Sequence, residues 1–248
     1  DTSERYAAAL NYVIKTDSLG STLKFIVDYN QSAPTKGEDS HAMINENGIA
    51  KDSLYNYRNT SLYRIATASV ARERTLSSHW KLKYGAKYTY NEVNSASQYR
   101  YENAGVWVPS VVDDFDISYA ENIGAAYATA TMNYGRFSAV VGLRGEYTNF
   151  QDNTGDIKQN YFDLFPNANA SVSLSEDGAY SLIAQYSRSI SRPSFWALSP
   201  NETKISEYMI QRGNPKLKPA LSNNLSLTAV FKDKYTLTVG MTIMKNGI

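Results

Sequence analysis

Apolar and polar residues alternate along most of the chain, as in β-strands that have two different faces. Over 80–90, apolar and aromatic residues occupy the even positions, and Lys, Gly and Thr occupy the odd ones. Helical spacing fits neither this segment nor the others with the same alternation, which are 23–30, 136–148, 180–187, 224–231 and 235–243. The pattern therefore predicts an all-β protein.

The connections between these strands alternate in length. Short turns are predicted at 16–20, 74–78, 134–136, 176–179 and 232–234, and long connections at about 31–59, 93–116, 150–160 and 191–220. About ten strands of roughly ten residues or more result, whereas strands of soluble domains have about five or six residues. Long strands with short turns on one rim and long loops on the other indicate an outer-membrane β-barrel.

Composition fits a barrel once the strand faces are separated. The mean hydropathy of −0.44 is that of a water-soluble protein, but a lipid face and a wet face average to such a value. No stretch approaches the roughly 20 apolar residues of a membrane-spanning helix. The net charge of +1 argues against a nucleic-acid binder, and the absence of cysteine excludes disulfide scaffolds and thiolate metal sites.

Tyrosine is unusually frequent, with 20 residues against 8 phenylalanines. Aromatic residues near the predicted short turns are Trp80, Phe137, Tyr180, Phe231 and Tyr235, and those near the long loops are Tyr29, Tyr90, Tyr147, Tyr161 and Tyr186. Two aromatic rows at opposite strand ends are what the two membrane–water interfaces of a barrel select. Tyrosine also suits strands in general, so the rows support the barrel without proving it.

Three stretches carry a specific family resemblance. They are 186–200 (YSRSISRPSFWALSP), the element Gly213-Asn214-Pro215-Lys216-Leu217-Lys218-Pro219, and 161–167 (YFDLFPN). With 80–88 and 142–148, they resemble the barrel of TonB-dependent outer-membrane receptors, and most of all the Bacteroidetes-type outer membrane β-barrel family. Many relatives carry Glu after the last proline of that element, where this chain has Ala220.

The resemblance implies a closed barrel of about 22 strands with a plugged lumen. It places the protein in a Gram-negative outer membrane, where it takes up a ferric chelate, glycan or peptide. TonB-supplied energy would act through the plug, and a surface lipoprotein is a further possible partner besides outer-membrane lipid. Residues 1–248 are expected to form part of one barrel domain without its plug or its last strand. We therefore expect an open, strongly curved antiparallel sheet of about ten strands.

Chemistry-bearing residues are few. His41 and His79 are predicted at opposite rims, so they cannot share a catalytic site, and the sequence predicts no enzyme and no cofactor. Asp113, Asp114 and Asp116 form an acidic cluster that could hold calcium, although solvated loop carboxylates are more common. Candidate substrate contacts in or near the long loops are Trp107, Arg192, Phe195, Trp196, Tyr208 and Arg212. The element Gly213–Pro219 is predicted to be a stiff, extended lead into the next strand, with Gly213 adopting a backbone conformation closed to other residues.

Other functions stay open on the sequence alone. A plugless passive channel or an adhesin barrel would have the same strand pattern. A barrel hydrolase would depend on His41 or His79, and a soluble β-sandwich or propeller would partition into water without detergent.

Overall fold

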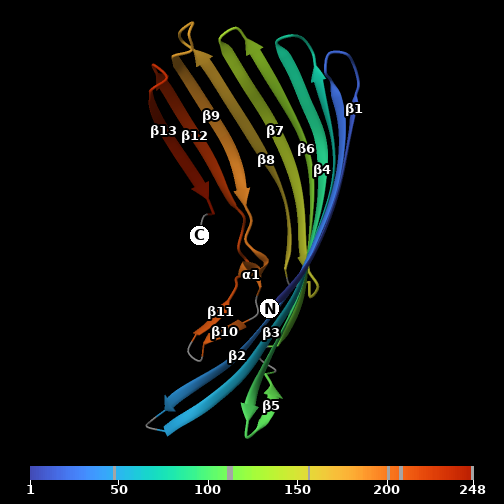
Figure 1. Ribbon diagram of the computed structural model, residues 1–248, viewed down its shortest axis with the longest axis vertical. Coiled ribbons are helices and arrows are strands. Elements are labelled where there is room, and N and C mark those ends of the chain that lie inside the picture. The colour runs from blue at the N-terminus through green and yellow to red at the C-terminus, as the bar shows by residue number, and fades with distance from the viewer. Residues whose placement is uncertain (47–48, 111–113, 156, 200–201, 207–208, 247–248) are drawn as a thin grey trace.

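The computed structural model describes residues 1–46, 49–110, 114–155, 157–199, 202–206 and 209–246. Nearly all of them lie in one curved antiparallel sheet (Figure 1). Its strand order is β1-β2-β3-β4-β6-β7-β8-β9-β12-β13, with β5 paired to β4. Chain neighbours are sheet neighbours throughout, apart from two excursions that contain β5 and the pair β10–β11.

The strands are long at one side of the sheet and shorter at the other. Their bounds are β1 Thr2–Lys15, β2 Thr22–Glu46, β3 Ile49–Thr75, β4 Trp80–Asn103, β5 Val106–Pro109, β6 Phe115–Tyr134, β7 Phe137–Asp152, β8 Lys158–Ser173, β9 Tyr180–Ser191, β10 Glu202–Ser206, β11 Met209–Arg212, β12 Ala220–Phe231 and β13 Tyr235–Lys245. One helical turn, α1, spans Phe195–Leu198. The prediction of an all-β, antiparallel barrel segment is confirmed.

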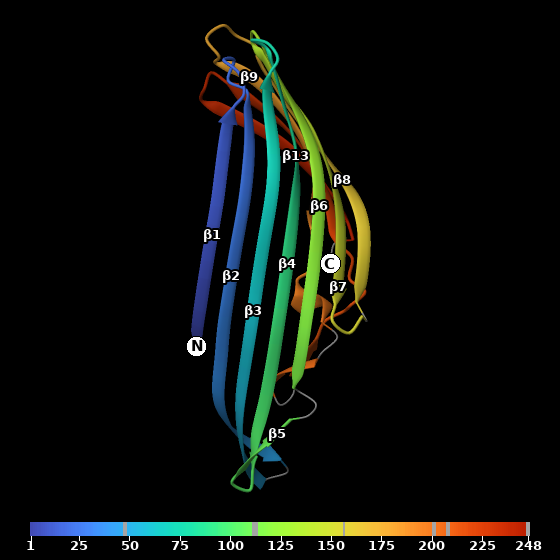
Figure 2. The same cartoon turned by 90° about the vertical axis from the view of Figure 1, so that its right-hand side faces the viewer.

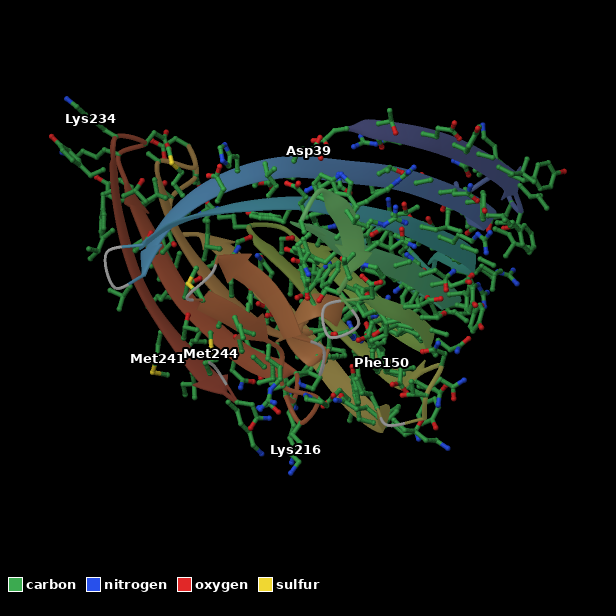
Figure 3. All side chains as sticks on the ribbon, turned by 90° about the horizontal axis from the view of Figure 1, so that it is seen from below. Asp39, Phe150, Lys216, Lys234, Met241 and Met244 are labelled. Carbon is green, nitrogen blue, oxygen red and sulfur yellow. The ribbon has the colours of Figure 1, made fainter. Side chains whose placement is uncertain are left out.

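The sheet is open, as predicted. Within the described ranges, β1 pairs only with β2, and β13 pairs only with β12. Seen from below, β1 and β13 lie at the two margins of a curved shell (Figure 3). Every residue of both strands is exposed, because neither strand has a neighbour on its outer side.

All five predicted short turns are present at one end of the sheet, the upper end in Figure 1. The long connection expected over 31–59 is wrong, because β2 and β3 continue as a paired hairpin to Glu46 and Ile49. A barrel strand needs about 9–11 residues to cross a membrane, and β2 and β3 have 25 and 27. More than half of this hairpin therefore extends beyond the membrane, where both faces are wet and the alternation used for prediction fades.

The convex face carries the apolar side chains that the alternation predicts. Leu10, Leu143, Leu237 and Val239 are 67%, 49%, 61% and 64% exposed. Exposure of this kind along whole strands is what a lipid-facing surface requires. The side view in Figure 2 shows the bow of the sheet that carries these side chains.

The predicted aromatic rows are present on this face, with one correction. Trp80, Phe137 and Tyr235 are exposed beside the short turns, and Tyr147 is 52% exposed at the opposite end of its strand. Tyr161 instead faces the concave side, where its hydroxyl accepts a hydrogen bond from Arg192. Its strand neighbour Phe162, at 62% exposure, takes the outward position, so the assignment of Tyr161 to the row was off by one residue.

Candidate functional site

The chain leaves the sheet after β9 and returns at β12, and residues 192–219 between them are called the inner segment. α1 belongs to this segment and lies on the concave side of the sheet (Figure 1). Pairing of β8 with β9 stops at Asn167 and Ser187, although both strands continue beyond these residues. The two strands separate there, and the inner segment begins beside that separation.

Arg192 fixes the start of the inner segment to the wall of the sheet. Its Nη2 donates to Glu146 Oε2 at 2.8 Å and to Thr148 Oγ1 at 3.2 Å. Its Nε donates to the Tyr161 hydroxyl at 3.1 Å and lies 3.5 Å from Glu121 Oε1. Side chains from the three wall strands β6, β7 and β8 thus surround one guanidinium. Its several N–H groups can donate to more than one acceptor at once.

The charges around Arg192 balance within the wall. Arg144 Nε also contacts the Glu146 carboxylate, and Asn91 donates to Glu121 Oε2 at 2.7 Å. Glu121 and Glu146 are each only 8% exposed. Burying two carboxylates is costly unless they are paired and hydrogen-bonded, and two arginines and an amide meet that requirement here.

An aromatic stack holds α1 against the wall. The Phe195 ring lies 5.5 Å from the Tyr119 ring and 5.8 Å from the Phe150 ring, with interplanar angles of 20° and 16°. Leu198 completes the contact at 4% exposure, in a cluster that also contains Ile117 and Ile157. The ring separations are those of favourable offset aromatic pairs, so the cluster holds α1 on the wall by apolar contact.

The Gly213–Pro219 element packs on α1, and its geometry differs from the prediction. Gly213 is not among the glycines with positive φ. A Cβ at Gly213 would instead lie 2.5–2.6 Å from the carbonyl oxygens of Trp196, Ala197 and Ser199. The glycine is therefore required for close backbone approach and not for an unusual turn.

The element is also not fully extended. The Leu217 amide donates to the Asn214 carbonyl at 3.1 Å, and the Lys216 amide donates to the Asn214 side chain at 3.0 Å. The prediction of an extended lead is wrong here, because proline fixes φ at a value that turns share with extended backbone. On the wall, Gln159 Nε2 donates to the Leu217 carbonyl at 3.1 Å, which anchors the far end of the inner segment.

A hollow of about 260 Å³ lies between the inner segment and the wall. Apolar and aromatic side chains form part of its lining, from Tyr63, Ile65, Val93, Phe150, Phe195 and Leu198. Asn91, Glu121, Gln159 and Arg192 add polar groups. An apolar surface with a few fixed polar groups is the usual make-up of a small-molecule site.

The predicted substrate contacts are distributed over separate places. Arg192 and Phe195 line the hollow, whereas Trp196 is 43% exposed and meets Phe115 edge to face at 5.8 Å. Trp107 is 49% exposed on β5, and Arg212 ends the exposed strand β11. Tyr208 lies outside the described residues.

The acidic cluster is not assembled by the described part of the chain. Asp114 Oδ1 accepts the Tyr99 amide at 2.6 Å, Asp116 lies on β6 opposite Ala96, and Asp113 lies outside the described residues. Among the described residues no group of three acidic or histidine side chains is placed to hold a metal ion.

No helix in the described part of the chain is long and apolar enough to cross a membrane.

The two histidines lie at opposite ends of the sheet, as expected. His41 is in the β2–β3 extension, where its Nε2 lies 2.7 Å from Asp52 Oδ1. His79 is in the β3–β4 turn beside Tyr134. Neither is near the hollow or near the other histidine.

Residues 14–248 match the family model of the outer membrane protein beta-barrel family. The chain belongs to this family. The protein is thus a β-barrel protein of the outer membrane, and the exposed apolar face is its lipid-facing surface. A comparison with curated protein sequences gives no significant match.

Solved structures agree with the family's fold. The copper transporter OprC superposes with a TM-score of 0.67 at 13% identity, over 96% of this chain and 38% of OprC. The ferric citrate transporter FecA gives a TM-score of 0.55 at 15% identity, over 98% and 34%. The RagAB peptide transporter gives 0.54 at 13% identity, over 98% and 30%. The chain spans about a third of the length of these proteins.

The sequence did not identify Glu121, Glu146 and Gln159 as partners of the inner segment. The one signal was that Glu146 falls on the polar face of its strand, between Arg144 and Thr148. Which strand residue lies opposite which depends on register, and register is set by pairing between strands and not by one strand's pattern.

Proposed function

We propose that the protein is part of an outer-membrane receptor that takes up a nutrient with TonB-supplied energy. The observation that carries this proposal is the anchored inner segment. It occupies space on the concave face of the barrel wall and contacts that wall through Arg192, Phe195 and Leu217. An energised receptor must close its lumen between transport events, and a segment anchored inside the barrel wall contributes to such closure.

The nutrient is proposed to be a ferric chelate, a glycan or a peptide. The solved structures of this fold include transporters named for ferric citrate, copper and peptide, so the barrel itself does not select one class. Trp107, Trp196 and Arg212 remain proposed substrate contacts, because exposed aromatic and basic side chains can stack on and attract such solutes. Tyr208 is kept as a proposed contact on the sequence alone. A surface lipoprotein is a further proposed partner.

The first test is the parent reading frame together with growth of deletion strains. We expect a plug domain of about 100–150 residues in the same polypeptide, an ordinary domain length. Deleting the gene should abolish growth on one scarce nutrient from a panel of ferric chelates, glycans and peptides, and deleting tonB should abolish the same growth. A barrel without such a domain, with growth unaffected by tonB and stable open conductance in planar bilayers, would identify a passive channel instead.

A further inference from the structure

Five lysines gather on the concave face of β1, β2 and β4, between the short-turn rim and the level of Glu146. They are Lys15, Lys24, Lys81, Lys83 and Lys87, called the lysine patch below. Their common face follows from strand alternation and register. Asn91 reaches Glu121 on the concave side, and side chains two residues apart share a face, so the three β4 lysines lie on that side.

Register extends this face to the other two lysines. Gly85, between Lys83 and Lys87, pairs with Ala71, and Ala71 pairs with Lys24. Lys15 pairs with Thr22, two residues before Lys24 on the same face. The patch therefore crosses four adjacent strands, although β3 contributes no lysine to it.

The patch is not neutralised within the described part of the chain. The acidic residues on the same face are Glu73, opposite Lys83, and Asp28, which accepts a hydrogen bond from Thr67 at 3.0 Å. Five lysines and two carboxylates leave a net charge of 5 − 2 = +3. No lysine of the patch has an ion pair or a hydrogen bond among the described residues.

The rest of the concave wall on this half of the sheet is uncharged. Inward positions from β6 to β13, between the short turns and the level of Arg144, are Thr, Ser, Asn, Gln, Gly or apolar residues, such as Thr129, Gly142, Asn169, Gln185, Thr228 and Thr238. Farther from the short turns, the charges around Arg192 pair with one another. On this half of the concave wall, between the short turns and the level of Arg144, unpaired positive charge is thus confined to the patch among the described residues.

This arrangement is unfavourable by itself. Lys81 and Lys83 point the same way about 7 Å apart along one strand, and a concave surface concentrates the field of like charges. Across four strands the patch is about 14 Å wide, which exceeds the reach of a small anion. Its occupant must offer several anionic groups in fixed positions, and in a protein domain these are the carboxylates of Asp and Glu.

We propose that the lysine patch binds an acidic face of the plug domain, in the part of the same polypeptide outside residues 1–248. This inference rests on the proposed function and adds to it the wall strands that hold the plug and the chemistry of the contact. Carboxylates of the plug lie within salt-bridge distance of Lys83 and Lys87, at the centre of β4. The lysines of β1 and β2 extend the contact sideways.

Zero-length cross-linking of the full-length protein in detergent micelles tests this contact. A water-soluble carbodiimide activates a carboxylate, which then forms an amide with a lysine amine in direct contact. We expect mass spectrometry to find Lys83 and Lys87 joined to Asp or Glu residues of the same polypeptide outside residues 1–248. The double variant Lys83→Glu with Lys87→Glu should lose these products at least tenfold and should make the plug more sensitive to protease.

The matched control is Lys232→Glu with Lys234→Glu, two exposed lysines of the β12–β13 turn at the same rim. This control should leave both the cross-links and the protease pattern unchanged. Acetylation of native protein should modify Lys83 and Lys87 several-fold more slowly than Lys232 and Lys234.

Three outcomes would overturn the inference. In the first, the patch lysines acetylate as fast as the turn lysines. In the second, they cross-link only to a separate polypeptide. In the third, they are protected only when inorganic phosphate is added, which identifies a site for small anions. A failed TonB growth test with an intact cross-link would refute energised uptake but not the contact, so the two failures are distinguishable.

Discussion

At the residue scale, Arg192 connects the inner segment to the wall more directly than any apolar contact does. It meets Glu146, Thr148 and Tyr161 through separate hydrogen bonds, while its own side chain is 25% exposed. A charged group in this setting is worth more than a surface ion pair, because its carboxylate partners are almost fully buried and water cannot replace a lost donor at low cost.

Removing this guanidinium should release the inner segment. We expect Arg192→Ala to reduce the free energy of local opening around α1 by about 2 kcal/mol or more, because Glu146 and Glu121 lose a charged donor. Hydrogen exchange of the Leu198 and Asn214 amides in the full-length protein measures this opening.

Arg136→Ala is the matched control for that variant. Arg136 pairs with Glu176 at 2.8 Å, but the two side chains are 48% and 91% exposed. Exposed pairs contribute about 0–1 kcal/mol, so exchange near α1 should not change. Equal effects of the two substitutions would show that the Arg192 network does not hold the segment.

Asp17, in the β1–β2 turn, provides a pH-dependent contact outside the membrane. Hydrogen bonds from the Ser21 side chain and backbone, together with one from the Leu19 amide, hold the pKa of Asp17 below its ordinary value of 3.8. A lowered pKa means that ionised Asp17 stabilises the folded turn above about pH 4 and that this stabilisation is lost as the pH falls through the folded pKa. The turn should therefore be intact at neutral pH and loosen only in acid.

Carbon NMR of ¹³C-labelled aspartate in the micelle-bound protein measures this titration. We expect the Asp17 carboxyl to titrate below pH 3.8, and Ser21→Ala to move its midpoint upward because the hydroxyl donor is lost. An unchanged midpoint in the variant would remove Ser21 as the cause.

At the scale of elements, the Gly213–Pro219 element and α1 form one unit because their backbones touch. The Asn214 amide donates to the Ala197 carbonyl at 2.7 Å, and Gly213 has no room for a side chain. The sequence predicts that this element leads into a strand. In the structure it also supports the backbone of α1, 16 residues earlier in the chain.

Gly213→Ala should separate the two elements. The added methyl group would meet three backbone carbonyls that cannot move like flexible side chains, and such overpacking costs about 1–3 kcal/mol. Increased protease cleavage between residues 199 and 213 of the full-length protein measures the effect. Gly124→Ala is the control, because a Cβ at Gly124 meets nothing within 4 Å, and similar cleavage of both variants would contradict this support of α1.

The sequence predicts the elements well where one face meets lipid. Over 80–90 the alternation gives the strand, its face and its turn, because a lipid face tolerates few polar side chains. The same logic fails over 31–59, where the β2–β3 hairpin extends into water and Asn, Ser and Thr occupy both faces. It also fails at the Arg192 site, whose partners lie 31–71 positions away in sequence and come together only through strand register.

At the scale of the whole molecule, the curved sheet has two unpaired edges. A lipid bilayer cannot satisfy free backbone N–H and C=O groups, so barrels that cross membranes have no edges. β1 and β13 each pair on one side only, and their outward side chains, such as Tyr12 and Met241, are as apolar as those of the central strands. Both edges therefore require further strands.

We expect β1 and β13 to be paired on both sides in the full-length protein. Their amides should then exchange in micelles as slowly as those of β4, whereas the turn residues Lys232 and Lys234 should exchange fast. Residues 1–248 expressed alone should aggregate, because exposed edge strands form templates for other chains. Fast exchange of alternate β1 and β13 amides in the full-length protein would contradict a closed barrel, since those amides are the ones that point away from β2 and β12.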